Sequence, residues 1–190
     1  MPSDALTTDL TQLLRDAEEL DAVYNLLVVE APPPQHKLDA LCRAVVVMCV
    51  SAWETYVENV SIEAVLAMRP GGGQLGSWSV HHAGVLGRAR AFHTPNPDNV
   101  KNLLSDAVGL ADVRPAWMWA GYTSVQAVQA LGRALNYRHK IAHGTNPRPA
   151  VLHTYSSRLP GFFRKLGAAT DRAVRDHLVN VLGINNPWPP

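Results

Sequence analysis

Hydrophobic side chains recur along the start of the chain at alternating steps of four and three. They are Leu6, Leu10, Leu13, Ala17, Leu20, Tyr24 and Leu27. This spacing is that of one face of an α-helix, so we predict a helix that is packed along its whole length. Ser3 stands before the stripe as a suitable N-cap, and the prolines at 32–34 end the helix.

A second long helix is predicted from about Lys37 to Met68. No helix-breaking residue interrupts this stretch until the sequence RPGGG at 69–73. Its valine-rich centre is compatible with a strand, but the flanking sequences LDALCRA and WETYVENVSIEAVLAM favour a helix. The pattern therefore predicts two long neighbouring helices at the amino end of the chain.

The middle of the chain carries shorter helical patterns. Residues Ser79 to Phe92 read as one short helix. The sequence TPNPDN at 94–99 supplies a cap and prolines for the start of another helix, which ends near Gly109. We expect the aromatic sequence DVRPAWMWAGY that follows to be an irregular connection.

A strong helix begins at Thr123 or Ser124, since either side chain is a suitable N-cap, and runs to His143. Gly144 is well placed to end this helix, and Pro147 prevents its continuation. A last helix is predicted from about Gly161 to Leu182.

No run of alternating polar and apolar residues is long enough for a sheet. The whole pattern predicts an all-α fold, a bundle with two long antiparallel helices and a later helix. We assign residues 1–183 to one helical domain and residues 184–190 to a Pro-rich tail.

Composition and charge add little that is specific to a function. Hydrophobic residues make up 47% of the chain and charged residues 17%, which is ordinary for a globular protein. The formal net charge of +1 gives no global basic field, so any binding of nucleic acid depends on a local patch.

Targeting features point to a protein of the cytoplasm. The longest apolar stretch, at 44–53, is shorter than the roughly 20 residues that span a bilayer, and the amino terminus lacks the pattern of a signal peptide. Cys42 and Cys49 lie about 10 Å apart along one predicted helix, too far to form a disulfide with each other. We therefore expect a cytoplasmic protein with no membrane partner.

The sequence NYRHKIAHG, at 136–144, places an arginine and two histidines at the end of a predicted helix. These cations are favourable beside the negative end of the helix dipole, which is the simplest interpretation. His139 and His143 also share one helical face, as in zinc-binding helices. However, Lys140 stands where catalytic zinc helices carry a glutamate, so we expect no metal.

A third interpretation joins Arg138 with His143. The two residues lie about 140° apart around the helix axis and would flank a groove at the helix end. Histidine transfers protons near neutral pH, and arginine is a permanent planar cation suited to a phosphate. Cleavage of a phosphodiester without a metal requires these two functions.

The sequence RHKIAHG resembles the signature of the HEPN superfamily, an arginine followed by a polar residue and then a histidine at a helix end. His139 stands where asparagine is more usual. SAWETYVENV resembles a segment of the RiboL-PSP type of HEPN protein, and TPNPDNVKNLLSDAVGL resembles the stretch that precedes its motif helix.

This resemblance implies a helical homodimer in which two motifs form one composite cleft. Active members are endoribonucleases that need no metal or other cofactor and leave a 2′,3′-cyclic phosphate and a 5′-hydroxyl. Carried onto this chain, His143 is the general base or acid and Arg138 stabilises the transition state. His139 either orients the phosphate or polarises groups of the partner subunit. The resemblance also implies a toxin or antiphage-defence effector that has an antitoxin or another partner protein.

Further residues are candidates for supporting this site. Glu54 lies in an apolar segment; if it is buried it needs a partner, for which the arginine of the motif helix is suitable, and the alternative is a solvated residue on the face of its helix. Tyr137 is suited to stacking on a base, and Lys140 and Arg148 to holding the RNA backbone. The alternative function is a non-catalytic HEPN module that dimerises or binds a nucleotide or a protein.

Overall fold

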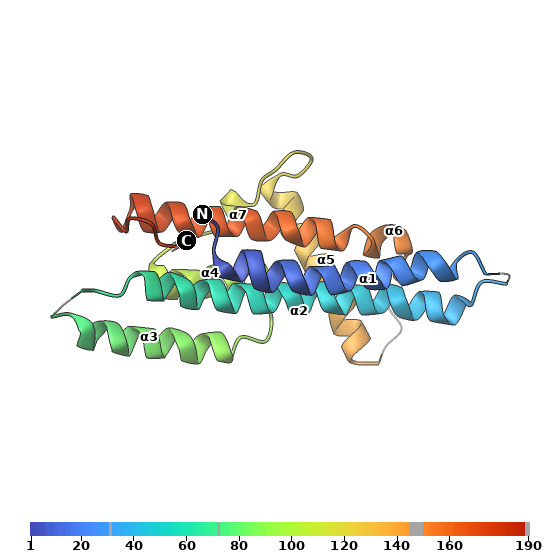
Figure 1. Cartoon of the computed structure of the whole chain (residues 1–190), viewed down its shortest axis with the longest axis horizontal. Coiled ribbons are helices and arrows are strands. Elements are labelled where there is room, and N and C mark those ends of the chain that lie inside the picture. Colours follow the sequence, from blue (N-terminus) through green and yellow to red (C-terminus); the bar gives the residue numbers. More distant parts are fainter. Residues whose placement is uncertain (31, 72, 145–149, 189–190) are drawn as a thin grey trace.

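The computed structural model describes residues 1–30, 32–71, 73–144 and 150–188, and the fold is all-α (Figure 1). No strand occurs among these residues, and Trp119 and Tyr122 form an isolated bridge. The helices in chain order are a π-helical turn η1 (Ala5–Leu10), α1 (Thr11–Leu27), α2 (Gln35–Ala67), α3 (Leu75–Arg90), α4 (Pro97–Val108), a 3-10 turn η2 (Arg114–Ala116), α5 (Ser124–Ala142), α6 (His153–Ser156) and α7 (Leu159–Asn180).

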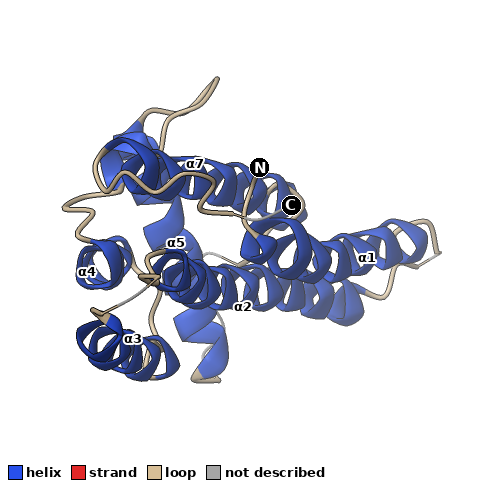
Figure 2. Ribbon diagram, turned by 60° about the vertical axis from the view of Figure 1, so that its left-hand side comes forward, coloured by secondary structure: helices blue, strands red, loops and turns tan. Residues whose placement is uncertain are grey.

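The long helix α2 forms the centre of the fold. It contacts α1, α3, α4, α5, α6 and α7 (Figures 1 and 2). Its apolar side chains face several neighbours at once, so the valine-rich stretch is buried around most of the helix. The Trp53 ring packs edge-on against Trp117 with 6.2 Å between ring centroids, and its indole N–H donates to the carbonyl of Pro95 (3.1 Å).

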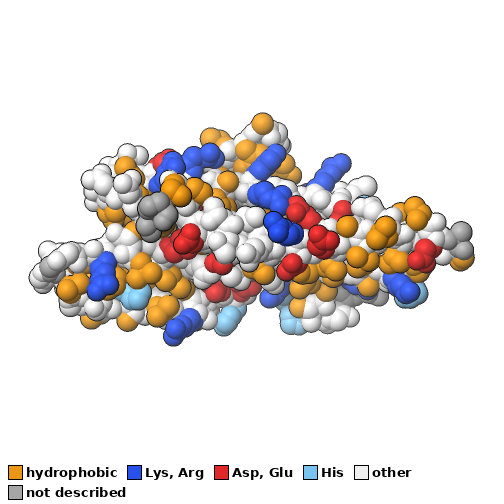
Figure 3. All heavy atoms as spheres, viewed as in Figure 1, with side chains coloured by type: hydrophobic (Ala, Val, Ile, Leu, Met, Phe, Trp, Pro, Cys, Tyr) orange, Lys and Arg blue, Asp and Glu red, His pale blue; other side chains and the backbone are white. Residues whose placement is uncertain are grey.

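The predicted pair of long antiparallel helices is α1 and α2. On the outer face, Lys and Arg side chains lie mainly over α7 and acidic side chains mainly over α1 (Figure 3). Arg164 of α7 donates to Glu18 of α1 (2.9 Å) across this boundary. Both side chains are 45% exposed, so water screens the pair and its contribution to stability is small.

Several predicted helix ends are wrong by a few residues. α3 begins at Leu75, four residues before the predicted Ser79, because Gly76 does not interrupt the helix. The short helix α6 was not predicted. At the amino end Asp4 occupies the N-cap position, although the hydroxyl of Ser3 accepts a hydrogen bond from the Leu6 amide (3.2 Å).

The segment assigned as a tail folds back onto the helices. Pro187 and Trp188 are buried, and Trp188 belongs to the hydrophobic core. The amide of Ile184 donates to the carbonyl of Leu178 (2.9 Å), which directs the chain back after α7. The packed part of the chain thus extends at least to Trp188.

By length and composition alone, α2 is apolar enough to cross a membrane, with a mean hydropathy of 1.4 in its most apolar window. Half of that window is buried against other helices. A central core helix has the same properties, so length and hydropathy alone do not assign α2 to a membrane.

Candidate active site at the end of α5

Local sequence defines both ends of α5. Thr123 is its N-cap and forms a capping box with Gln126, in which the Gln126 amide donates to the Thr123 hydroxyl (3.3 Å). At the other end Gly144 adopts a left-handed backbone conformation (φ 67°), and its amide donates to the carbonyl of Ile141 (3.1 Å). The predicted start of α5 and the glycine after its end are confirmed, and the helix ends at Ala142 with His143 as its C-cap.

The packing of α5 determines which side chains face inward. Ala127, Leu131 and Ala134 are buried, and α5 passes behind α1 and α2 so that its carboxyl end projects beyond α2 (Figure 1). No aspartate or glutamate occurs in Ser124–Ala142. The exposed end of α5 is therefore a cationic surface without an acid of its own.

Arg138 is directed toward α2. Its Nη2 atom lies 3.8 Å from Oε2 of Glu54, and the two side chains are 36% and 16% exposed. The separation is that of an ion pair and is longer than a hydrogen bond. Burial raises the pKa of Glu54 above its usual value, and the charges of Arg138 and His93 oppose this rise. Glu54 thus meets Arg138, which is one of the two arrangements that the sequence allowed.

His139 and His143 lie together on the exposed side of the helix end. Their ring centroids are 4.3 Å apart with an angle of 58° between the planes. Within the described part of the chain, no hydrogen bond or ion pair joins Arg138 to either histidine. One chain therefore presents the histidine pair and the arginine on different sides of α5.

The three residues that the sequence predicts to contact RNA lie in different surroundings. The Tyr137 ring packs against Tyr155 of α6, with 5.1 Å between centroids, so it contributes to the contact between α5 and α6. Lys140 lies partly buried in the last turn of α5. Arg148 lies outside the described residues.

The structure adds Glu58 and His93 to the surroundings of Glu54. Burial raises the pKa of Glu58, the charge of Glu54 raises it further, and the charge of His93 lowers it. Glu58 follows Glu54 by one helical turn, a spacing that indicates a shared face. His93 comes from the connection between α3 and α4, and nothing in the local sequence indicates its place.

Metal ligands do not gather at this site. In the described ranges of the chain, no group of three or more histidine, cysteine, aspartate or glutamate side chains is arranged to hold a metal ion. His139 and His143 alone supply two ligands, which is fewer than a protein zinc site uses.

Comparison with known proteins identifies one family. The RiboL-PSP-HEPN family matches residues 11–74, which comprise α1, α2 and the connection to α3. Arg138 and His143 lie outside the matched segment. No curated protein and no solved structure matched the chain. The match over residues 11–74 supports membership of the HEPN superfamily, and the all-α fold is consistent with it.

Proposed function

We propose that this protein is a metal-independent endoribonuclease, with Arg138 and His143 as its catalytic residues. One observation carries the proposal. A HEPN chain presents a permanent cation and two histidines at the exposed end of a helix that contains no acid. An anionic substrate meets no carboxylate of α5 at this position, while Glu54, which pairs with Arg138, is mostly buried.

The chemistry uses the RNA's own hydroxyl as the nucleophile. A neutral His143 accepts the proton of the 2′-hydroxyl, and the 2′-oxygen forms a bond to the adjacent phosphorus. The bond from phosphorus to the 5′-oxygen breaks, and a protonated histidine returns a proton to that oxygen. Arg138 stabilises the negative charge that develops on the phosphoryl oxygens. The products carry a 2′,3′-cyclic phosphate and a 5′-hydroxyl.

Two copies of the chain provide both proton-transfer groups. Before the reaction, one histidine has to be neutral as the base and another protonated as the acid. A homodimer that joins the exposed ends of two α5 helices supplies a His143 for each role. It also brings the Arg138 of one copy toward the histidines of the other. In this arrangement His139 orients the phosphate, and Tyr137, Lys140 and Arg148 contact the adjoining RNA.

The biological role that accords with this activity is that of a toxin or antiphage-defence effector in the cytoplasm. Uncontrolled cleavage of RNA harms the host cell, so such an enzyme requires an antitoxin or another regulating partner. This setting rests on the resemblance of RHKIAHG to HEPN ribonucleases. Slower growth of a bacterial host that expresses the wild-type chain, relieved by His143→Ala, supports it.

The direct test is cleavage of total bacterial RNA by the purified protein in excess EDTA, with the product ends mapped. Arg138→Ala and His143→Ala are expected to abolish cleavage. His36→Ala is the matched control, because His36 is another exposed histidine, in the first turn of α2. Cleavage by wild type and the control, but by neither motif variant, supports the proposal. Equal cleavage by all four proteins points to a contaminating nuclease and contradicts it.

A non-catalytic module is the second candidate, and one observation favours it. The guanidinium of Arg138 faces Glu54 and not the histidines of its own chain. In that case the exposed end of α5 binds a second copy, a nucleotide or a protein without cleaving RNA. Dimerisation of the wild type that depends on this helix end, together with no cleavage of any natural RNA, would support this function.

A further inference from the structure

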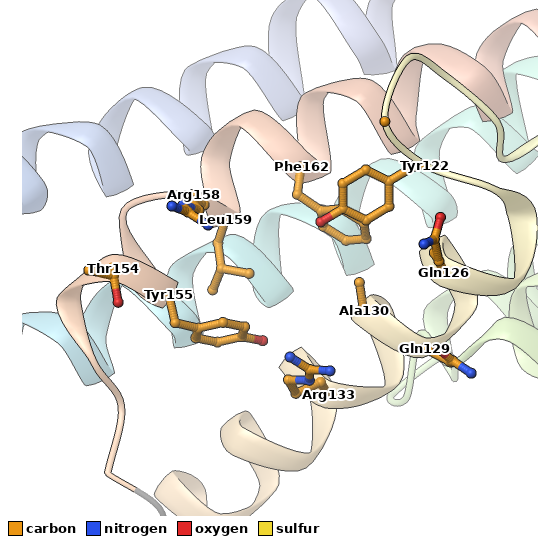
Figure 4. Close-up of a pocket in the computed structure, with 11 residues that line it drawn as sticks. Tyr122, Gln126, Gln129, Ala130, Arg133, Thr154, Tyr155, Arg158, Leu159 and Phe162 are labelled. Carbon is orange, nitrogen blue, oxygen red and sulfur yellow. The ribbon is translucent and has the colours of Figure 1, made fainter.

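A groove of about 630 Å³ lies between α5 and the helices α6 and α7, away from the Arg138–Glu54 pair. Figure 4 shows the side chains that line it. Those that matter here are Tyr122, Gln129, Arg133, Tyr155, Arg158 and Phe162. The groove is separate from the candidate catalytic residues, and neither the family match nor the HEPN motif includes these side chains.

Two arginines give the groove its charge. Arg133 comes from α5 and Arg158 from the start of α7, and both are exposed. No aspartate or glutamate lines the groove, and neither guanidinium forms an ion pair within the described ranges. Elsewhere in the fold, exposed arginines such as Arg88 and Arg164 do pair with acids. The groove therefore favours an anionic ligand, and a guanidinium group is suited to a phosphate.

The hydroxyl of Tyr155 indicates an unfilled polar position in the same groove. Its oxygen is buried and has no hydrogen-bond partner in the described part of the chain. Buried polar groups in proteins are nearly always hydrogen-bonded, so this one calls for an explanation. Figure 4 shows the Tyr155 ring pointing from α6 into the groove toward Arg133. A ligand atom held by Arg133 is well placed to accept this hydrogen bond.

Aromatic rings form one wall of the groove. Tyr122 lies 5.8 Å from Phe162 between ring centroids, and Trp119 packs against both rings. Tyr122 is 38% exposed, so part of its ring is accessible from the solvent. An aromatic surface beside two cations and the exposed amide of Gln129 has the features with which proteins bind a nucleotide of single-stranded RNA.

The groove also lies in line with the catalytic end of α5. Arg133 precedes His143 by ten residues, which is about 15 Å along the helix axis. Gln129 and Lys140 lie within about 40° of Arg133 around the helix, and His143 lies about 80° from it. A strand of RNA that occupies the groove can thus follow one side of α5 to His143.

We propose that this groove binds a nucleotide of the single-stranded RNA substrate a few nucleotides away from the cleaved bond. Arg133 and Arg158, which lie apart along the groove in Figure 4, each contact a phosphate of the strand, and the base stacks on Tyr122 beside Phe162. The Tyr155 hydroxyl donates to a phosphate or ribose oxygen. This proposal rests on the proposed ribonuclease function, because it assigns the groove to the same substrate.

The test measures binding separately from cleavage. A fluorescently labelled short single-stranded RNA is titrated with His143→Ala protein, in which cleavage is blocked, and anisotropy is recorded at several salt concentrations. Adding Arg133→Gln or Arg158→Gln is expected to weaken binding and to reduce the salt slope by about one for each. Tyr122→Ala is expected to weaken binding by about fivefold or more.

Two further variants make the result specific. Arg172→Gln removes the same charge from an exposed position on α7 outside the groove and is expected to leave affinity unchanged. Tyr155→Phe is expected to weaken binding without lowering the melting temperature, since its hydroxyl has no partner to lose. A Tyr155→Phe protein that melts earlier and binds RNA normally overturns this role for the hydroxyl.

The possible results separate this proposal from the proposed function. If the two groove arginines affect binding no more than Arg172 does while the wild type cleaves RNA, the groove assignment is wrong and the ribonuclease stands. If the groove variants weaken binding but the wild type cleaves nothing, the ribonuclease is wrong and the groove remains a nucleotide site. Equal affinity for duplex and single-stranded RNA overturns the assignment to a stacked single strand.

Discussion

The guanidinium of Arg138 lies 3.8 Å from the carboxylate of Glu54, measured from Nη2 to Oε2, and this ion pair joins α5 to the middle of α2. Glu54 lies within the segment that matches the RiboL-PSP-HEPN family, whereas Arg138 lies far outside it. The pair therefore connects the segment that matches the family with the candidate active site. It also fixes the side of α5 from which the guanidinium can reach a phosphate.

Replacing Glu54 with Gln is expected to lower the rate of RNA cleavage by about tenfold, a change of about 1.4 kcal/mol in the activation free energy. The amide keeps the size of the side chain but loses the charge that orients Arg138. The fold should persist, since Arg138 is 36% exposed and water can solvate its charge. Single-turnover cleavage and thermal unfolding of the same samples measure both effects.

Glu58→Gln is the matched control for this experiment. Glu58 lies one turn further along α2 and also has a raised pKa, but in the described part of the chain it forms no ion pair with Arg138. Its replacement breaks no ion pair with Arg138 and is expected to change the cleavage rate by less than about threefold, or about 0.65 kcal/mol in activation free energy. Equal losses in the two variants would mean that the acidic environment matters and the ion pair does not.

The parts of this structure that sequence could predict depend on local interactions. Thr123 and Gly144 mark the ends of α5 because capping and left-handed backbone are properties of a few adjacent residues. Glu54 could be paired with Arg138 because a carboxylate in an apolar helix requires a cation. The sequence left a solvated Glu54 equally open, because burial of that side chain depends on how α5 packs against α2, and the length of 3.8 Å depends on the same packing.

The features that sequence missed depend on segments that are distant in the chain. His93 approaches Glu54 only because the connection after α3 passes beside α2. The groove requires α5, α6 and α7 to be placed together, and Tyr155 of α6 lies in a helix too short to have a periodic pattern. Trp188 is buried although the proline-rich sequence around it is typical of an exposed tail.

Replacing Gly167 with Ala is expected to destabilise the fold by about 1–3 kcal/mol, because the added methyl group has no space. A Cβ atom at this position would lie 2.3 Å from Cδ2 of Leu10, a fully buried side chain of the π-helical turn η1. Leu10 would have to move within the core, and η1 would shift relative to α7. Chemical denaturation gives the change in the free energy of unfolding.

Gly161→Ala on the same helix provides the comparison. No atom lies within 4 Å of a Cβ built at Gly161, and alanine favours helix more than glycine does. This variant is expected to be unchanged or up to about 1 kcal/mol more stable. A Gly167→Ala protein as stable as Gly161→Ala would show that η1 and α7 do not pack as closely as described.

Replacing Tyr56 with Phe is expected to lower the free energy of unfolding by about 1 kcal/mol, and the melting temperature by about 2–4 °C. The Tyr56 hydroxyl donates to the carbonyl of Gly167 (3.0 Å) and holds α2 close to α7 in a fully buried position. Tyr155→Phe makes the same chemical change at a hydroxyl without a partner and should show no such loss. Calorimetry of both proteins tests whether the Tyr56 bond stabilises the fold.

The stability of the fold is expected to fall as pH rises from about 5 to about 8, and Glu63 is one cause. Burial raises the pKa of Glu63 from its ordinary value of 4.5 to about 7, although the amides of Ala5 and Asp4 donate to its carboxylate. Between these two values the folded chain holds a proton that the unfolded chain has lost. Its contribution to stability is full below about pH 4.5 and is lost as pH rises through about 7.

Glu63→Gln mimics the protonated side chain and should flatten this pH dependence in melting curves recorded from pH 5 to pH 8. Some slope remains, because burial also raises the pKa of Asp171 and Glu54. Asp112→Asn is the control, because the pKa of Asp112 is shifted in the opposite direction from that of Glu63. Its bond with Arg114 lowers the pKa of Asp112, so that bond stabilises the fold across the whole range above the ordinary value of 3.8. The Asn variant should therefore melt earlier by a constant amount and keep the wild-type slope. If Glu63→Gln retains the full slope, the other carboxylates and not Glu63 produce the pH dependence.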